Sequence, residues 1–426
     1  MQTPVEAVEA PQAVDEGARR LRLPPAFASL RYRNYRLLWF GQLVSSSGDW
    51  MDQVALNWLV VSQLYDGREA ALPVAALNAC RLVPILVFTP IGGVLADRLE
   101  RRRLMFTTQA AAMVMAFVLA TLVATGLVEF WMVLAIALGR GVMLSFNMPA
   151  RQSLISELVP REALTNAVAL NSATLNLTRV AGPLIAAIFF LTPFGIAGAF
   201  YFNGLTFLAV LAGLAIMEIP RQPARARQGM LSELAGGFAY INRSVVLRTL
   251  VILATVPMVF GMPYQTMSAV VSRDVLGTGG EGFGLLTAAT GVGAVCGALT
   301  VASLAPEARK GRLMLVGLCC FGLSIVVFAA SSWFMLSVLA MAAVGVCQQI
   351  YLASNNTLLQ LHAEDEYRGR VMSTLFLSRG MVPLGTVIAG VATTVVGVQW
   401  ALGAMASVLV VLALLTARAA PRVRDL

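Results

Sequence analysis

The chain has 426 residues, of which 58% are hydrophobic and 12% are charged, whereas a soluble domain carries roughly 25% charged residues. So few charges cannot cover a water-facing surface of this size, which excludes an ordinary soluble protein. The net charge of +9 does not indicate a nucleic-acid partner, because the basic residues lie in short clusters between apolar runs instead of on one face.

Metal-dependent and nucleotide-driven proteins are excluded on similar grounds. His362 is the only histidine, and the five cysteines lie inside apolar runs without Cys-x-x-Cys spacing, so we expect no metal site. Lys310, the only lysine, is followed by glycine, so the chain has no Walker A loop for ATP. A membrane enzyme would need a nucleophile–base pair at membrane depth, which the sequence does not offer. We therefore predict no enzymatic activity and no cofactor.

The predicted elements begin with residues 1–29, an Ala/Glu/Pro-rich stretch without an apolar core, which we expect to be a disordered cytoplasmic tail. A hydrocarbon core of roughly 30 Å needs about 20 apolar residues per helix. Six such segments fall within residues 30–217 and six within 250–417, with a basic linker at 218–249 and a tail at 418–426. The twelve predicted helices are residues 37–64, 74–96, 104–125, 130–147, 164–191, 195–217, 250–271, 283–304, 313–330, 333–358, 371–396 and 399–417.

The distribution of basic residues predicts the orientation. If the N-terminus is cytoplasmic, 25 of the 31 basic residues lie on the cytoplasmic side, and only Arg68 and Arg273 lie in loops on the outer side. Cytoplasmic loops of membrane proteins carry such an excess of Lys and Arg. We therefore predict a multi-pass protein of the inner (cytoplasmic) membrane with both termini in the cytoplasm.

The second half of the chain echoes the first. Residues 174–184 (TLNLTRVAGPL) and 374–384 (TLFLSRGMVPL) match at six of eleven positions, and residues 101–105 resemble residues 310–314 more weakly. Chance matching of apolar sequence is the competing explanation. Repeats of the same orientation predict an all-α integral membrane fold of about 12 transmembrane helices in two pseudo-symmetric six-helix bundles. The substrate site is then expected at the bundle interface, near the bilayer midplane.

Charged residues inside predicted helices need a partner or a function, because each costs at least about 2.5–3.5 kcal/mol on insertion scales. Asp49 and Asp52 are the only acids placed within a helix, and their spacing puts them on one helix face. Arg140 is predicted at a similar depth in the fourth helix. The basic residues placed within helices, and thus candidate partners, are Arg81, Arg140, Arg179 and Arg379.

Two interpretations of the aspartates stay open. Desolvation favours the protonated form of a carboxylate and a nearby arginine favours the ionised form, so a change of either during transport would couple protonation to conformation. Asp49 and Asp52 are then the proton-coupling residues. The alternative is a permanent ion pair that only fixes the first and fourth helices.

The remaining polar residues in the predicted helices are candidates for substrate contacts. Arg179 and Arg379 each precede a proline by four residues, and they either face the cavity, where they would suit an anionic or catechol-type ligand, or bind backbone carbonyls and snorkel. Neutral polar residues either line the cavity or join packed helices by hydrogen bonds. These residues are Asn57, Asn78, Tyr264, Gln265, Gln348, Gln349 and Asn355.

Several motifs resemble those of the major facilitator superfamily. Residues 93–102 (GVLADRLERR) are similar to its signature Gly-x-x-x-Asp-Arg-x-Gly-Arg-Arg, with Glu100 in place of the second glycine. Residues 182–187 (GPLIAA) resemble the Gly-Pro-x-x-Gly-Gly motif of its antiporters. Residues 32–50, 149–160 and 367–371 resemble the branch that contains the enterobactin exporter and macrolide efflux proteins. The resemblance implies a gating motif of Gly93, Asp97, Arg98, Arg101 and Arg102, and an antiporter-like motif of Gly182 and Pro183.

Together these features predict a secondary active transporter. The resemblance implies export of an amphipathic small molecule, a drug or a siderophore, and the buried aspartates favour coupling to protons. A membrane-embedded receptor or scaffold on a transport fold, or an importer of the same architecture, is the alternative. We expect the partners to be the small-molecule substrate, protons and membrane lipid, and the protein to be a monomer.

Overall fold

The computed structural model describes residues 24–217, 240–242, 244–303, 309–364, 367, 371 and 377–426, with the backbone alone at residues 90–91 and 93–98. Helices form nearly all of this described part, which contains no strand. The first elements are η1 (Pro25–Arg31), α1 (Arg33–Leu59), η2 (Val60–Leu64), η3 (Gly67–Ala70), α2 (Ala71–Arg98), α3 (Arg101–Ala124), α4 (Phe130–Leu158), α5 (Arg161–Phe190) and α6 (Gly195–Ile216). The later elements are α8 (Val245–Phe260), α9 (Tyr264–Asp274), α10 (Gly280–Ser303), α11 (Lys310–Ala330), α12 (Phe334–His362), α14 (Val382–Val396), α15 (Val398–Ala419) and α16 (Pro421–Arg424).

Eleven helices of the described part are long and apolar enough to cross a membrane. One of them combines α8 and α9, which together run from Val245 to Asp274. α1 is not among the eleven because polar side chains interrupt its apolar sequence, but its 27 residues reach about 40 Å at 1.5 Å per residue. The all-α membrane fold is thus confirmed, while the count of twelve spans remains a prediction.

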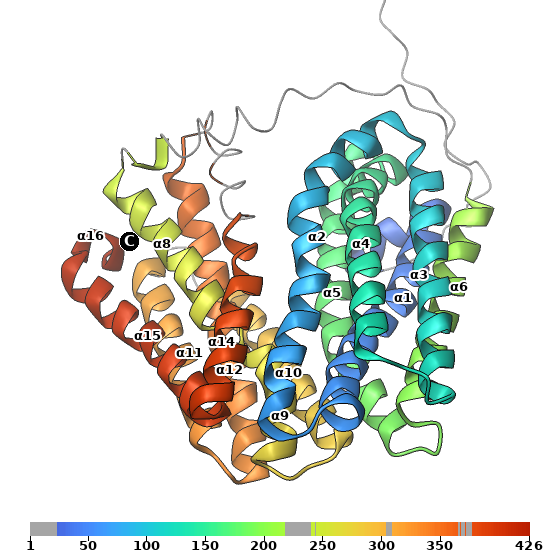
Figure 1. The fold of residues 1–426 in the computed structure, drawn as a ribbon. Coiled ribbons are helices and arrows are strands. Elements are labelled where there is room, and N and C mark those ends of the chain that lie inside the picture. The colour runs from blue at the N-terminus through green and yellow to red at the C-terminus, as the bar shows by residue number, and fades with distance from the viewer. Residues whose placement is uncertain are drawn as a thin grey trace, which may run out of the picture.

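The helices gather into two groups, α1–α6 and α8–α16, that touch near one end and diverge toward the other (Figure 1). In the first group α1 packs against α5 and α6, and α2 against α4. In the second group α12 packs between α10 and α11, and α15 packs against α11. The main contacts between the groups join α5 to α10 and α2 to α14. The predicted boundaries of the two bundles stay predictions, because most of the 218–249 linker lies outside the described residues.

Apolar side chains fill the spaces between the helices and also form much of the outer surface. Phe200, Phe283 and Phe321 are fully buried between helices. Leu191 and Trp400 instead belong to a large set of exposed apolar side chains. An apolar exterior of this extent is typical of a surface that meets lipid.

The structure contains short helices within both predicted tails. The N-terminal tail was expected to reach residue 29, but η1 already begins at Pro25 and buries Ser29. Asn166 of α5 holds it, accepting a hydrogen bond from the backbone N–H of Ser29 at 2.9 Å and donating to the carbonyl of Ala26 at 2.9 Å. At the other terminus, α16 lies within the predicted tail, and its Val423 is buried.

Three predicted helices also have different bounds. α4 continues to Leu158 instead of ending near residue 147, which brings Arg151 into a helix. The predicted helix at 250–271 is broken before Tyr264, because Pro263 cannot continue an α-helix that leads into it. Pro383 stands in the first turn of α14 and does not kink a helix, whereas Pro183 lies inside the continuous α5.

Candidate functional site

Glycines bring α1 close to its neighbours and so fix the position of its polar face. A Cβ atom on Gly48 would collide with Thr206 and Asn203 of α6, and one on Gly41 would lie 2.8 Å from the Cα of Val210. On another face, a Cβ on Gly182 of α5 would lie 2.8 Å from the carbonyl oxygen of Ser47 and so collide with α1. Gly182 of the antiporter-like motif therefore allows α5 to pack closely on α1.

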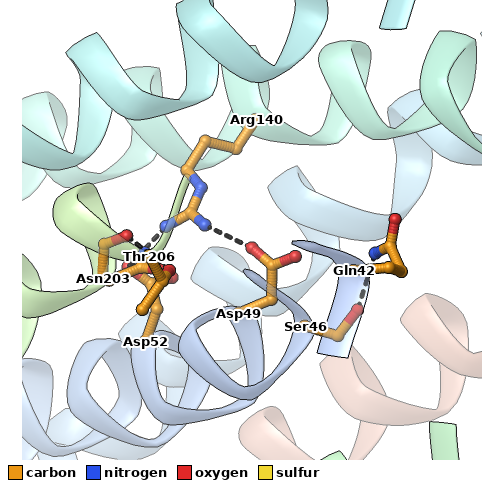
Figure 2. A network of polar contacts seen from close by, with 7 residues as sticks. All are labelled: Gln42, Ser46, Asp49, Asp52, Arg140, Asn203 and Thr206. Atoms are coloured by element: carbon orange, nitrogen blue, oxygen red, sulfur yellow. Dashed lines mark hydrogen bonds and ion pairs between the residues drawn. The ribbon is translucent and has the colours of Figure 1, made fainter. Parts of the chain in front are cut away.

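Arg140 joins the two predicted aspartates (Figure 2). Its Nη2 donates to Asp49 Oδ1 at 2.9 Å, and its Nη1 forms an ion pair with Asp52 Oδ1. Asn203 of α6 also donates to Asp52 Oδ1, at 3.1 Å. Arg140 of α4 and both aspartates of α1 are thus in direct contact, whereas Asn203 was not predicted. Its signal was a polar residue in a strongly apolar helix.

The two aspartates differ in exposure. The side chain of Asp49 is 34% exposed, whereas that of Asp52 is 0% exposed, and Arg140 is only 8% exposed. The second carboxylate oxygen of Asp52, Oδ2, is buried without a hydrogen-bond partner. The same arginine therefore contacts one carboxylate that is open to its surroundings and one that is sealed.

Asp49 lines a cavity of about 320 Å³ whose lining residues all come from α1–α6. The aspartates were expected at the interface of two bundles; this stays a prediction, because parts of the second group lie outside the described residues. Its apolar wall includes Leu144 and Phe207, and the guanidinium of Arg140 lies 5.9 Å from the centre of the Phe207 ring. A cavity with apolar walls and a few polar groups is the usual form of a small-molecule site.

Two further arginines line this cavity. Arg81 of α2 was predicted, and a Cβ atom on Gly141 would lie 3.2 Å from the carbonyl carbon of Arg81, so α4 packs closely where Arg81 and Arg140 meet. Arg151 was placed in a loop by the sequence and is instead a buried residue of α4. Its spacing of eleven residues from Arg140, three turns of an α-helix, was the signal that would have found it.

A second polar cluster lies between the two helix groups, in a pocket of about 30 Å³. Arg179 of α5 lies 5.8 Å from the centre of the Trp50 ring and donates to Gln348 Oε1 of α12 at 3.2 Å. Tyr264 donates to the same oxygen at 3.3 Å and accepts from Gln265 at 3.3 Å. The structure thus brings together predicted residues from both halves of the chain.

The other predicted cavity residues are divided among different surroundings. Asn78 lines the larger cavity and donates to Asn57 Oδ1 at 2.7 Å, while Asn57 lines the pocket between the groups. Gln349 packs toward Gly297 of α10, and Asn355 is buried in α12. Arg379 is exposed, so its surroundings do not match those of Arg179 despite the repeat.

The gating motif is described only in part. The side chains of Asp97 and Arg98 lie outside the described residues, as does any contact of Gly93. Arg101 forms an ion pair with Glu157 of α4, and Arg102 donates to the carbonyl of Ala215 at 2.9 Å. These two contacts hold α3, α4 and α6 together.

An ion pair joins the two helix groups at the end where they touch. Arg273 at the end of α9 donates to the backbone carbonyl of Tyr65 at 2.7 Å and also to that of Val61. It forms an ion pair with Asp66 as well. One arginine of the second group therefore fastens the loop that follows α1.

The family model for transmembrane secretion effectors matches residues 25–425, nearly the whole chain. The chain belongs to this family of the major facilitator superfamily. It is a multi-pass membrane transporter and not an enzyme.

Curated relatives cover most of the chain. It is 24% identical to the staphyloferrin A transporter of Staphylococcus aureus, over 82% of this chain and 87% of that protein. It is 22% identical to macrolide efflux protein A of Streptococcus pyogenes (87% and 92%) and 28% identical to the enterobactin exporter EntS of Shigella flexneri (79% and 79%). The resemblance to the enterobactin exporter and macrolide efflux branch is confirmed.

A solved structure shares the fold. A bacterial homologue of the human lysosomal transporter Spinster, in an inward-facing and unoccupied conformation, matches 92% of this chain and 98% of its own with a TM-score of 0.70 at 15% identity. At this identity the likeness concerns the fold alone.

Proposed function

We propose that the protein is a proton-coupled exporter of amphipathic small molecules, of the drug or siderophore class, that works by alternating access. The proposal includes a location in the inner membrane with both termini in the cytoplasm, and a monomer surrounded by lipid. The names of the relatives support the substrate class and the outward direction. The excess of basic residues on one side of the predicted topology supports the orientation.

One observation carries the proton coupling: a single arginine, Arg140, is shared by Asp49 at the cavity wall and Asp52 behind it. Two carboxylates share one guanidinium at contact distance in a poorly solvated place, while Arg81 and Arg151 face them only from beyond ion-pair distance. Such a group of charges is stabilised when it binds one proton. The unpartnered Oδ2 of Asp52 is a place for that proton.

The arrangement of the helix groups supports alternating access. Close backbone contacts of α5 with α10 include Phe190 at Gly280 and Arg179 at Gly291, in the last part of α5 and the first part of α10. Beyond them the groups diverge (Figure 1). With the predicted orientation, the touching end is the outer one, so the cavity would open toward the cytoplasm, from which an exporter takes its substrate.

The first test compares variants in which a carboxylate becomes a neutral amide of the same shape. Cells that overexpress the protein or lack it are compared on a panel of macrolides and siderophores, and a compound that separates them is then followed in inverted membrane vesicles with an imposed pH gradient. Asp49→Asn and Asp52→Asn should each abolish uptake driven by the gradient, because the coupling charge is lost. Asp425→Asn, the same change at an exposed terminal residue, should leave uptake unchanged.

Two outcomes would count against the proposal. Gradient-driven uptake that persists in both Asp49→Asn and Asp52→Asn would reduce the triad to an ion pair that only fixes α1 and α4. Growth that never differs between overexpressing and deletion cells, together with no flux in vesicles, would favour a receptor or scaffold.

A further inference from the structure

The larger cavity has more positive than negative groups on its wall. Arg81, Arg140 and Arg151 line it, and among the described residues Asp49 is the only acid on its wall. Asp52 lies behind Arg140 and brings the local total to three positive and two negative formal charges. Since Arg140 already binds both aspartates, the excess positive charge belongs to the other two arginines.

Arg81 and Arg151 each have a buried N–H donor that lacks a described acceptor. Arg81 Nη1 and Arg151 Nε are both buried and without a hydrogen-bond partner among the described residues. Arg151 is only 9% exposed as a whole. No carboxylate of the described part lies within ion-pair distance of either side chain. A buried charged donor without an acceptor is costly and rare, so these two groups mark a place where an acceptor belongs.

The positions of the arginines describe the acceptor. Arg140 and Arg151 are eleven residues apart on α4, about 16 Å along the helix axis, and Arg81 lies beside the Arg140 end. The wall between the two ends includes neutral polar groups, among them Gln42, whose Oε1 is a buried acceptor without a partner. Apolar side chains cover the rest. A ligand for this cavity therefore carries an anionic group, a hydroxyl donor and an apolar body.

We propose that this cavity binds an amphipathic organic acid, with Arg81 and Arg151 donating to its carboxylate groups. The inference rests on the proposed transport function and names the substrate class of the same site. Arginine suits this task because its planar guanidinium matches a carboxylate and stays charged at any physiological pH. Asp49, on the same wall, would repel an anion placed against Arg140, which directs the carboxylate toward Arg81 or Arg151.

The experiment measures binding without any gradient. Full-length protein in detergent is titrated with salicylate and with salicylamide, which share the ring and the hydroxyl and differ in the charge of the carboxyl group, by isothermal titration calorimetry. Salicylate should bind at least tenfold more tightly than salicylamide. Because salicylate has one carboxylate and the two arginines lie at opposite ends of the cavity, each of Arg81→Gln and Arg151→Gln should weaken its binding in part. The double variant Arg81→Gln/Arg151→Gln should weaken it at least tenfold and leave salicylamide unaffected. Arg151→Lys should retain part of the preference, and Arg418→Gln, an exposed control, all of it.

Each contrary result overturns the proposal. Equal binding of acid and amide by the wild type, or no binding of salicylate, shows that the cavity has no preference for an anion, and this comparison does not depend on any variant folding. An unchanged preference in the double variant Arg81→Gln/Arg151→Gln places the anion elsewhere. If binding is charge-selective but flux ignores the pH gradient, only the proton coupling fails; if flux is proton-driven but binding ignores charge, only this inference fails.

Discussion

At the scale of single residues, Arg140 is held from three sides. Its guanidinium contacts Asp49 and Asp52 and lies over Phe207, and all of it except 8% of the side chain is withdrawn from solvent. A buried ion pair adds little net stability, but removal of one partner leaves a buried charge uncompensated. The stability of α1 against α4 therefore depends on this arginine more than on either carboxylate.

Arg140→Gln should destabilise the protein by about 3–5 kcal/mol, because it leaves the fully buried carboxylate of Asp52 without its cation. Combining it with Asp52→Asn should restore part of that loss, since that charge is then gone. Thermal unfolding of the purified variants in detergent checks both. A double variant that loses as much as the sum of the single losses would mean that the two groups do not interact.

The sequence predicted those residues of the site that place a charge within an apolar segment. Asp49, Asp52 and Arg140 stood out because a charge in a predicted helix is costly. Arg151 was missed because the polar residues around it resemble a loop, although α4 continues through them. Asn203 was missed because an uncharged amide gives no comparable signal, and the partners of Arg379 depend on a fold that the repeat alone does not determine.

At the scale of helices, glycine decides how closely α10 and α12 cross. A Cβ atom on Gly293 would collide with the backbone carbonyl of Ala342, and one on Gly345 would collide with that of Thr290. Two backbones therefore touch without intervening side chains, as small residues allow in membrane helices. The apolar segments alone predicted both helices, but not this crossing.

Gly345→Ala should lower the unfolding temperature, because backbone atoms of α10 cannot yield as a flexible side chain would. Gly403→Ala is the matched control, since a Cβ atom there meets nothing within 4 Å, and alanine is the better helix former. Differential scanning fluorimetry of the two variants tests the crossing. A decrease of equal size in both would show that the effect belongs to glycine substitution in general.

At the scale of the whole molecule, Arg273 holds the two helix groups together at one end. Arg273 binds two backbone carbonyls and Asp66 across the helix groups, whereas the Asp66 side chain is 95% exposed. Exposed ion pairs contribute roughly 0–1 kcal/mol. The hydrogen bonds to the two carbonyls therefore contribute more than the ion pair to holding the helix groups together. No neutral side chain would replace them in full.

Arg273→Gln should make the touching end open more often. Ser268, which is 1% exposed and lines the pocket between the groups, reports this when it is changed to cysteine in a chain whose five native cysteines are replaced. Ser268→Cys should react several-fold faster with a charged thiol reagent when Arg273→Gln is present. Asp66→Asn should have a smaller effect, and equal rates in all three chains would show that Arg273 does not hold this end.

Trp50 lies on the wall of both the larger cavity and the pocket between the groups, beneath Arg179. One indole ring therefore borders both compartments. When the five other tryptophans of the chain are replaced by phenylalanine, the wavelength of its fluorescence emission reports the hydration of this shared wall. A shift of this emission on ligand binding can then be distinguished from a shift on opening of the end that Arg273 holds, in the same fluorescence experiment.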